Sequence, residues 1–288
     1  GGKVVLITSV LENEGKSTVA VNLALSLAQK HQRVLDYIRR CVDDGVPPTV
    51  REICDSLGIK STSTGHKYLR ELEEMARTYR FALPPFCHFT PEEWQDKGHE
   101  YDEIRDNMLG WDITDYGLGD FDRVGFSLIT LRNGNLRLSG QYPKSYAEKL
   151  LYLKEGQYSP NHFHWSKMED IINRGGGTLL IRVYNSLPDE EIDRERAVTV
   201  HMDGRTFSVP AGTQLRLEPG MSVTIQPRLY HDFEVEPGTG DVLLGEVSQC
   251  NDDSIDNRFN PPMGRFPAIE EDEPPYRLLC TEYPAARD

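Results

Sequence analysis

From about residue 77 onward, apolar and polar residues alternate in short runs that are rich in β-branched side chains. Runs of this kind, bounded by Gly or Pro, predict β-strands. We expect strands at 124–132, 135–138, 178–184, 197–202, 205–209, 222–226, 232–235 and 241–248. Many short strands separated by such turns predict a mainly β domain, a sandwich or a jelly-roll barrel.

The first 76 residues instead carry apolar residues at helical spacing. A buried strand is predicted at 3–8, followed by a loop and by a helix that begins near Lys16. Three further helices are predicted at 34–42, 49–57 and 63–74. A short turn joins the last two, which is the layout of a helix-turn-helix, and Tyr68, Leu69 and Leu72 form the inner face of its third helix.

The two patterns divide the chain into three parts. They are a strand-helix fragment at 1–34, a helix-turn-helix segment at 35–76 and a β domain at 77–288. No Gly/Ser-rich or Pro-rich spacer marks either junction. We therefore interpret the chain as a fusion, a chimera of natural or artificial origin.

Composition narrows the classes of function. The 288 residues are 38% apolar, enough for a sizeable core, and carry a net charge of -14, which disfavours general binding to nucleic acid or anionic membrane. The five cysteines have no CxxC spacing, which favours reduced thiols and a cytoplasmic location. No apolar stretch is long enough to cross a bilayer, and no signal-peptide pattern is present.

Residues 156–176 contain the clearest candidate chemistry. His162 and His164 are two residues apart, so in a strand both imidazoles lie on one face, and Glu169 follows after a turn. A separate predicted strand delivers His231. Three imidazoles and a carboxylate suit a divalent first-row metal, and thiolate ligands of a structural zinc site are absent from this set.

Several motifs resemble known families. The pattern G-x5-H-x-H-x4-E-x6-G at 156–176 resembles the first motif of the cupins, and 220–231 resembles the second. FALPPFCHFTPEEW (81–94), EIRDNMLGWDITDYGLGDF (103–121) and GEVSQCNDDSIDNRF (245–259) resemble the D-lyxose isomerases, which are manganese-dependent cupin sugar isomerases. The resemblance implies a cupin barrel that binds Mn2+, or another divalent first-row metal, in its mouth.

The same resemblance implies an aldose-ketose isomerase that acts by enediol proton transfer on a free monosaccharide. Glu246 is the candidate base, against the alternative of an outward-facing strand carboxylate. Lys149 is the candidate for binding O1, against a solvated lysine. Asp256 and Arg258 are candidates for holding sugar hydroxyls, and a loop ion pair is the equal alternative.

The two segments before the β domain resemble other families. Residues 33–76 are similar to the DNA-binding domain of LexA, which implies that Ser61, Ser63, Thr64, His66 and Lys67 face DNA. Residues 1–35 resemble the phosphate-binding start of bacterial tyrosine kinases, with Gly-Lys-Ser-Thr at 15–18. The chain leaves that family before a magnesium-handling aspartate appears, so a structural remnant is the favoured interpretation.

The resemblance to the D-lyxose isomerases implies an enzyme that interconverts D-lyxose and D-xylulose, with D-mannose and D-fructose as a further pair. The alternative is a sugar-responsive DNA-binding regulator with a cupin sensor. Basic and acidic residues nearly balance within 33–74, which disfavours DNA binding by a single copy. The resemblance also implies a homodimer, and no membrane partner is expected.

Overall fold

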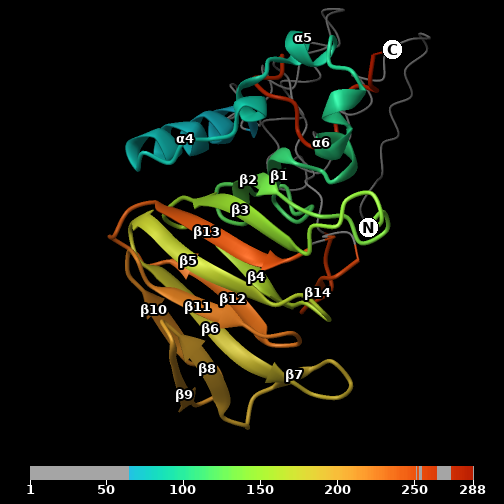
Figure 1. The fold of residues 1–288 in the computed structure, drawn as a ribbon. Helices are drawn as coiled ribbons and strands as arrows, with labels where there is room; N and C mark the ends of the chain where they lie inside the picture. The colour runs from blue at the N-terminus through green and yellow to red at the C-terminus, as the bar shows by residue number, and fades with distance from the viewer. Residues whose placement is uncertain (1–64, 251, 253–254, 265–273, 288) are drawn as a thin grey trace, which may run out of the picture. The chain divides into compact units, whose positions relative to one another are not determined.

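An eight-stranded antiparallel sheet is the largest element of the chain (Figure 1). We describe it in a computed structural model, which covers residues 65–250, 252, 255–264 and 274–287. In spatial order the strands are β1 (Gly110–Thr114), β2 (Phe126–Arg132), β3 (Tyr146–Leu153), β13 (Val242–Gln249), β5 (Glu169–Gly176), β11 (Ser222–Ile225), β8 (Val198–Met202) and β9 (Arg205–Val209).

A second antiparallel sheet contributes the strands that complete the fold. Its order is β10 (Gln214–Leu217), β6 (Leu179–Ser186), β12 (Tyr230–Val235), β4 (Tyr158–Phe163) and β14 (Arg258–Phe259), with β7 (Ile192–Asp193) paired to β6. Apolar side chains from both sheets form one core, including Leu128, Leu153, Ile181, Phe233 and Leu244. The predicted fold class, a mainly β cupin barrel, is confirmed.

Alternation along the strands of the large sheet separates two environments. In β3, Leu150 and Tyr152 belong to a second apolar cluster, whereas Leu151 and Leu153 belong to the core between the sheets. Because neighbouring residues of a strand point to opposite faces, both faces of the sheet are apolar where it is covered. The sheet therefore has an inner face, toward the second sheet, and an outer face.

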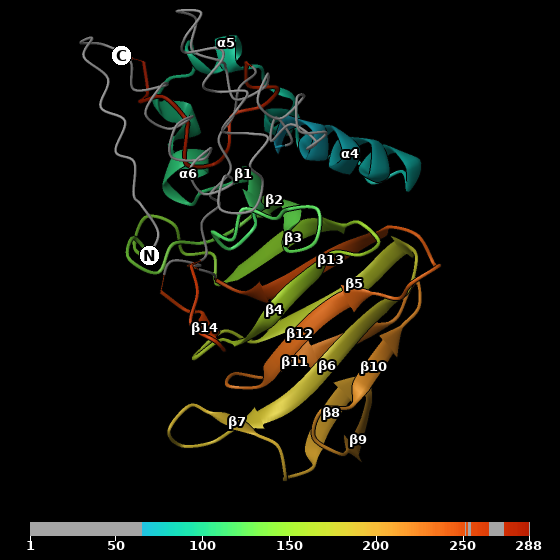
Figure 2. The ribbon, with the colours of Figure 1, turned by 180° about the vertical axis from the view of Figure 1, so that it is seen from behind.

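Helix α4 (Gly65–Thr78) covers part of that outer face (Figure 2). Leu69, Leu72 and Ala76 pack with Ile129, Leu131, Leu150 and Leu243 of β2, β3 and β13. The predicted inner face of this helix is confirmed as buried, but its partner is the sheet. The helix also runs past residue 76, where a boundary between parts was predicted.

Short helices follow α4 and precede the sheet. They are η1 (Pro85–His88), α5 (Pro91–Trp94), η2 (His99–Tyr101) and α6 (Asp102–Asp106). The start of α5 is fixed by a capping box, in which the Thr90 hydroxyl accepts from Glu93 N–H and the Glu93 carboxylate accepts from Thr90 N–H. No helix of the described residues has the length and apolar character needed to cross a bilayer.

Most predicted strands are present, but one is wrong. Residues 135–138 form a bend, because the side-chain oxygen of Asn135 accepts hydrogen bonds from the backbone N–H groups of Arg137 and Leu138, each at 3.0 Å. The sequence also missed β1, β5, β7, β10 and β14. The phosphate-loop-like fragment and the first two helices of the predicted helix-turn-helix lie outside the described residues.

Candidate metal centre and catalytic pocket

A polar cavity lies between the two sheets, inside the barrel. Each sheet contributes to its walls, the large one through β2, β3, β5 and β13 and the small one through β4, β12 and β14. Its polar lining consists of Tyr116, Lys149, Ser159, His162, His164, Lys167, Glu169, Glu246 and Asn257. Phe126, Leu128, Leu151, Ile171, Phe233 and Phe259 surround these groups with apolar surface.

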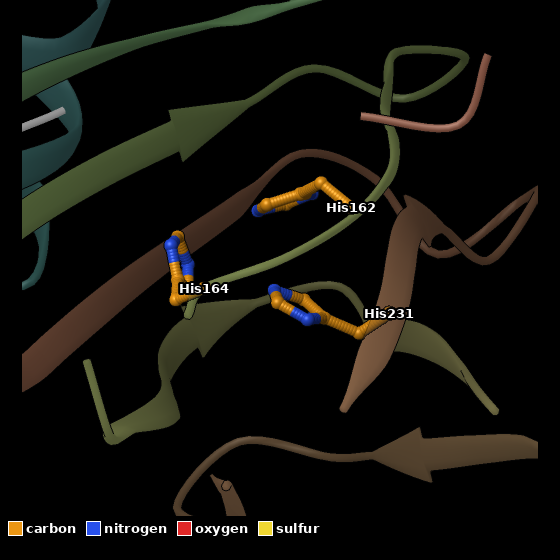
Figure 3. A group of neighbouring side chains, drawn as sticks. All are labelled: His162, His164 and His231. Atoms are coloured by element: carbon orange, nitrogen blue, oxygen red, sulfur yellow. The ribbon is translucent and has the colours of Figure 1, made fainter. Parts of the chain in front are cut away.

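Three histidines meet at this cavity, and two of them, His162 and His164, line it (Figure 3). His162 on β4 pairs in register with His231 on β12, and His164 follows the end of β4. One nitrogen of each ring lies within 4.8 Å of the others, and all three side chains are buried. The spacing of two residues and the separate strand together produce the convergence that the sequence predicted.

Backbone carbonyls fix the tautomer of every ring. Because a carbonyl only accepts, each Nδ1 carries the proton and donates it, at 2.7 to 3.1 Å, from His162 to Pro160, from His164 to Asp256 and from His231 to Leu229. The Nε2 atoms are left with their lone pairs free to bind a cation. Such carbonyl contacts are the usual orienting partners of metal-binding histidines.

Glu169, at the first position of β5, places a carboxylate beside two of these rings. Its Oε1 lies 3.4 Å from Nε2 of His164 and 3.2 Å from Nε2 of His231. Because the protons are on Nδ1, the Nε2 atoms and the Glu169 oxygen are all hydrogen-bond acceptors, and no proton lies between them. Nε2 of His231 is also buried without a hydrogen-bond partner. A divalent cation would satisfy all of these atoms, so the residues fit a metal of the group that imidazole and carboxylate prefer.

Burial and neighbouring charges set the protonation of the cluster. Desolvation, and then His231 and His164, holds the pKa of His162 well below its usual value, which keeps that ring neutral. For Glu169, burial by itself raises the pKa, but Lys167 and His164 outweigh it and hold the pKa of this carboxyl well below its usual value. A neutral imidazole at His162 and an ionised carboxylate at Glu169 are the forms of these two side chains that bind metal.

Two lysines and a second glutamate extend the cluster along the inner face of the large sheet. Nζ of Lys167 lies 2.6 Å from Oε2 of Glu169 and 3.1 Å from Oε1 of Glu246. Nζ of Lys149 lies 3.5 Å from the same oxygen of Glu246, its register partner on β13. These four side chains are between 3% and 6% exposed. Opposite charges therefore alternate through the buried cavity.

Lys167 is the functional residue that the sequence did not predict. A signal was available, because Lys167 stands two residues before Glu169 and residues at that spacing share a face in extended chain. The prediction assigned 165–168 to a turn and gave its side chains no direction. Among the described residues, Lys167 makes ion pairs with both glutamates of the cavity.

The remaining predicted residues lie elsewhere. The Asp256 carboxylate accepts hydrogen bonds from the backbone N–H groups of Trp165, Ser166 and Lys167 at 2.8 to 3.1 Å, so it holds the turn that carries Lys167. Arg258 lies 3.5 Å from Glu190 and does not line the cavity. The structure thus brings Glu246 and Lys149 to the four predicted ligands, and neither Asp256 nor Arg258 joins them in the cavity lining.

Comparison with known proteins gives two separate matches for the amino-terminal and carboxy-terminal parts. Residues 24–75 match the LexA DNA binding domain. The LexA repressor of Ruminiclostridium cellulolyticum is 51% identical over 51 residues, which are 17% of this chain and 24% of that repressor. The chain therefore resembles only a quarter of such a repressor.

The second match covers most of the chain. Residues 61–283 match the D-lyxose isomerase family. The D-lyxose/D-mannose isomerase of Serratia proteamaculans is 47% identical over 77% of this chain and 96% of its own length. That of Escherichia coli O157:H7 is 46% identical over 70% of this chain and 88% of its own length. The chain belongs to the D-lyxose isomerase family of aldose-ketose isomerases.

Proposed function

We propose that the chain interconverts D-lyxose and D-xylulose, and also D-mannose and D-fructose, with the help of Mn2+. The observation that carries the proposal is the convergence of three histidines and Glu169 beside Glu246 and two lysines in one buried cavity. The names of the relatives from Serratia proteamaculans and Escherichia coli support these two substrates. The hydroxyl and amide groups in the lining suit a polyhydroxylated ligand.

The proposed metal ligands are His162, His164, Glu169 and His231. When bound there, a divalent cation supplies Lewis-acid polarisation of the sugar carbonyl. Mn2+ agrees with a set of three imidazoles and a carboxylate that lacks a thiolate. The three carbonyl contacts at Nδ1 keep the rings oriented before any cation arrives, which reduces the conformational cost of binding.

Glu246 is the proposed base. Its carboxylate removes the proton from C2 of the open-chain aldose, the C2–H electron pair becomes the second bond between C1 and C2, and O1 gains negative charge. Glu246 then returns the proton to C1, while the hydroxyl proton of O2 passes to O1 and O2 becomes the ketone oxygen. Lys149 and Lys167 flank the Glu246 carboxylate at 3.5 and 3.1 Å, so they hold its orientation and offer positive charge to the enediolate.

Activity after metal removal tests this proposal. The full chain is treated with EDTA, assayed on D-lyxose and D-mannose, and assayed again after addition of Mn2+, Co2+, Zn2+ or Mg2+. We expect activity to vanish with the chelator and to return best with Mn2+, and we expect none from His162→Ala. A chain that binds metal but converts neither sugar contradicts the proposal, and a metal other than Mn2+ that restores more activity contradicts its choice of cofactor.

A sugar-responsive DNA-binding regulator is the second candidate function. The match of residues 24–75 to the LexA DNA binding domain is the observation in its favour. A fluorescent operator duplex titrated with and without D-lyxose tests it, and a sugar-dependent change in affinity is the result that this function requires. The homodimer and the phosphate-loop-like fragment stay predictions, and light scattering measures the first.

A further inference from the structure

Helix α4 is shared by two family matches. The D-lyxose isomerase match begins at residue 61 and the LexA match ends at residue 75, so they overlap over 61–75. Helix α4 (Gly65–Thr78) contains most of that overlap. The sequence of this helix therefore matches both an enzyme family and a DNA-binding domain. The structure shows against which residues its apolar face packs.

The apolar face of α4 is enclosed by described residues of the isomerase. Tyr68, Leu69 and Leu72 are 0%, 1% and 0% exposed. Leu69 and Leu72 belong to one cluster with the outer face of the large sheet. The Tyr68 ring lies 4.2 Å from the ring of Phe121, and its hydroxyl donates to Asp122, so this side chain is fixed at both ends.

Polar contacts also tie α4 to the segment near the C-terminus. The backbone N–H of Tyr276 donates to Nδ1 of His66 at 3.3 Å, and His66 is only 4% exposed. The Tyr276 hydroxyl donates to Glu73 at 2.6 Å, and Arg277 lies 3.5 Å from the same carboxylate oxygen. His66, which the LexA resemblance places on DNA, is thus inside the protein.

A helix-turn-helix needs this same face. Its third helix stays in position only if its apolar side chains pack on the other two helices, while its opposite side enters the major groove. A single stripe of side chains cannot be buried in two cores at once. The predicted inner face of the third helix, Tyr68, Leu69 and Leu72, is the face that the isomerase already buries.

We propose that α4 is a structural helix of the isomerase and that its packing on the sheet excludes DNA reading of the LexA type by the same chain. The folded isomerase and a complete helix-turn-helix compete for one helix. Operator binding then requires α4 to leave the outer face of the sheet. A chain with α4 on the sheet has no LexA-type affinity for DNA.

Matched variants on the two faces of the sheet test the proposal. Leu150→Ala with Leu243→Ala removes side chains that contact the α4 cluster. Leu153→Ala with Leu244→Ala makes the same deletions on the same strands in the core between the sheets. The full-length chain, loaded with Mn2+, is titrated against a fluorescent LexA operator duplex and a scrambled duplex. Hydrogen exchange of α4 and β12 amides reports release of the helix and integrity of the barrel.

In the unsubstituted chain we expect no preference for the operator, and we expect the α4 amides to be protected as well as those of β12. The outer-face variant should lose α4 protection, keep β12 protection and gain at least tenfold in operator affinity over the core variant. Should the double variants unfold, Leu150→Val carries the same prediction with a smaller gain. Operator binding by the unsubstituted chain with α4 still protected contradicts the proposal. An outer-face variant that loses α4 protection but gains no affinity for the operator contradicts it too.

Discussion

The two faces of strands β3 and β13 carry different kinds of side chain and have different roles. On the outer face, Leu150 and Leu243 belong to the apolar cluster that includes side chains of α4. On the inner face, Lys149 and Glu246 stand in register and line the cavity together with three of the proposed metal ligands, His162, His164 and Glu169. A step of one residue along the strand separates Leu150 from Lys149. Strand alternation therefore keeps the outer face of these strands apolar, whereas their inner face carries both core leucines and the charged residues of the cavity.

The free energy of burial also differs in sign between the outer-face leucines and the charged side chains of the cavity. Burying apolar side chains is favourable by about 1.5–3 kcal/mol each. Burying Lys149, Lys167, Glu169 and Glu246 costs desolvation energy, which their mutual attraction and hydrogen bonds only partly offset. Such a group of charges in a barrel is expected where function requires it. Leucines on both faces of these strands, Leu150 and Leu243 outside and Leu151 and Leu244 inside, therefore stabilise a sheet that also holds unfavourable but reactive charged groups.

The largest expected effect is on the inner face. Glu246→Gln keeps the size of the side chain but removes the base, so kcat should fall by roughly 10^2–10^4 while the amount of bound metal changes little. Steady-state assays and metal analysis measure this. Glu148→Gln, on the neighbouring strand at a partly exposed position paired with Arg132, is the matched control and should keep its activity. Equal activity of both variants contradicts the role of Glu246.

The next effect is on the outer face. Leu150→Ala leaves a cavity under α4, so the free energy of unfolding should fall by about 2–5 kcal/mol while kcat of the folded enzyme is unchanged. Urea denaturation followed by fluorescence measures the loss. Leu138→Ala, at a side chain that is 42% exposed, should change stability by less than about 0.5 kcal/mol. A comparable loss in both variants would show that the α4 contact adds nothing.

A smaller effect connects the lysines to the metal. Lys167→Met removes the ammonium between Glu169 and Glu246, so their charges repel and the carboxylate ligand loses its orientation. We expect metal affinity to fall about 10–100-fold, the range typical for lost supporting contacts. Lys144→Met breaks a partly exposed pair with Glu103 and should leave metal affinity unchanged. Calorimetric titration with Mn2+ measures the affinity of each variant. Unchanged affinity in Lys167→Met contradicts the supporting role of Lys167 at the metal site.

The smallest effect is on thiol reactivity and concerns Cys87, which belongs to the same apolar cluster as Leu150 and Leu243. Burial raises the pKa of its thiol to about 12, with a smaller lowering by Arg277. At pH 8 only about one thiol in 10^4 is then ionised, so iodoacetamide should barely modify it in the folded protein. Mass spectrometry of native and urea-unfolded samples measures the difference. Equal rates in the two samples contradict the tight packing of this cluster.

The sequence predicted well what periodicity determines. The i, i+2 spacing of His162 and His164 placed both rings on one face, and the downstream strand delivered His231 to the same point. Alternation also predicted most strands of both sheets. These features depend on local geometry, which the chain specifies without knowledge of what lies across the core.

The features that the sequence could not predict depend on contacts that a hydrophobic pattern does not show. The amphipathic pattern of α4 marked a buried face but could not say that the partner is the isomerase sheet. Lys167 was missed because the direction of its side chain depends on the turn that Asp256 holds from 89 residues further along the chain. Residues 135–138 read as a strand because the hydrogen bonds of the Asn135 side chain do not appear in a hydrophobic pattern.

The most direct test of the account follows the proton between C2 and C1. The Mn2+-loaded chain converts D-lyxose in D2O, and nuclear magnetic resonance follows the label after extended turnover. If Glu246 carries the proton, D-xylulose gains deuterium at C1 and recovered D-lyxose gains it at C2, because the carboxyl exchanges its proton with solvent. Product and substrate that stay free of deuterium through many turnovers would show direct hydride transfer between the carbons and contradict the account.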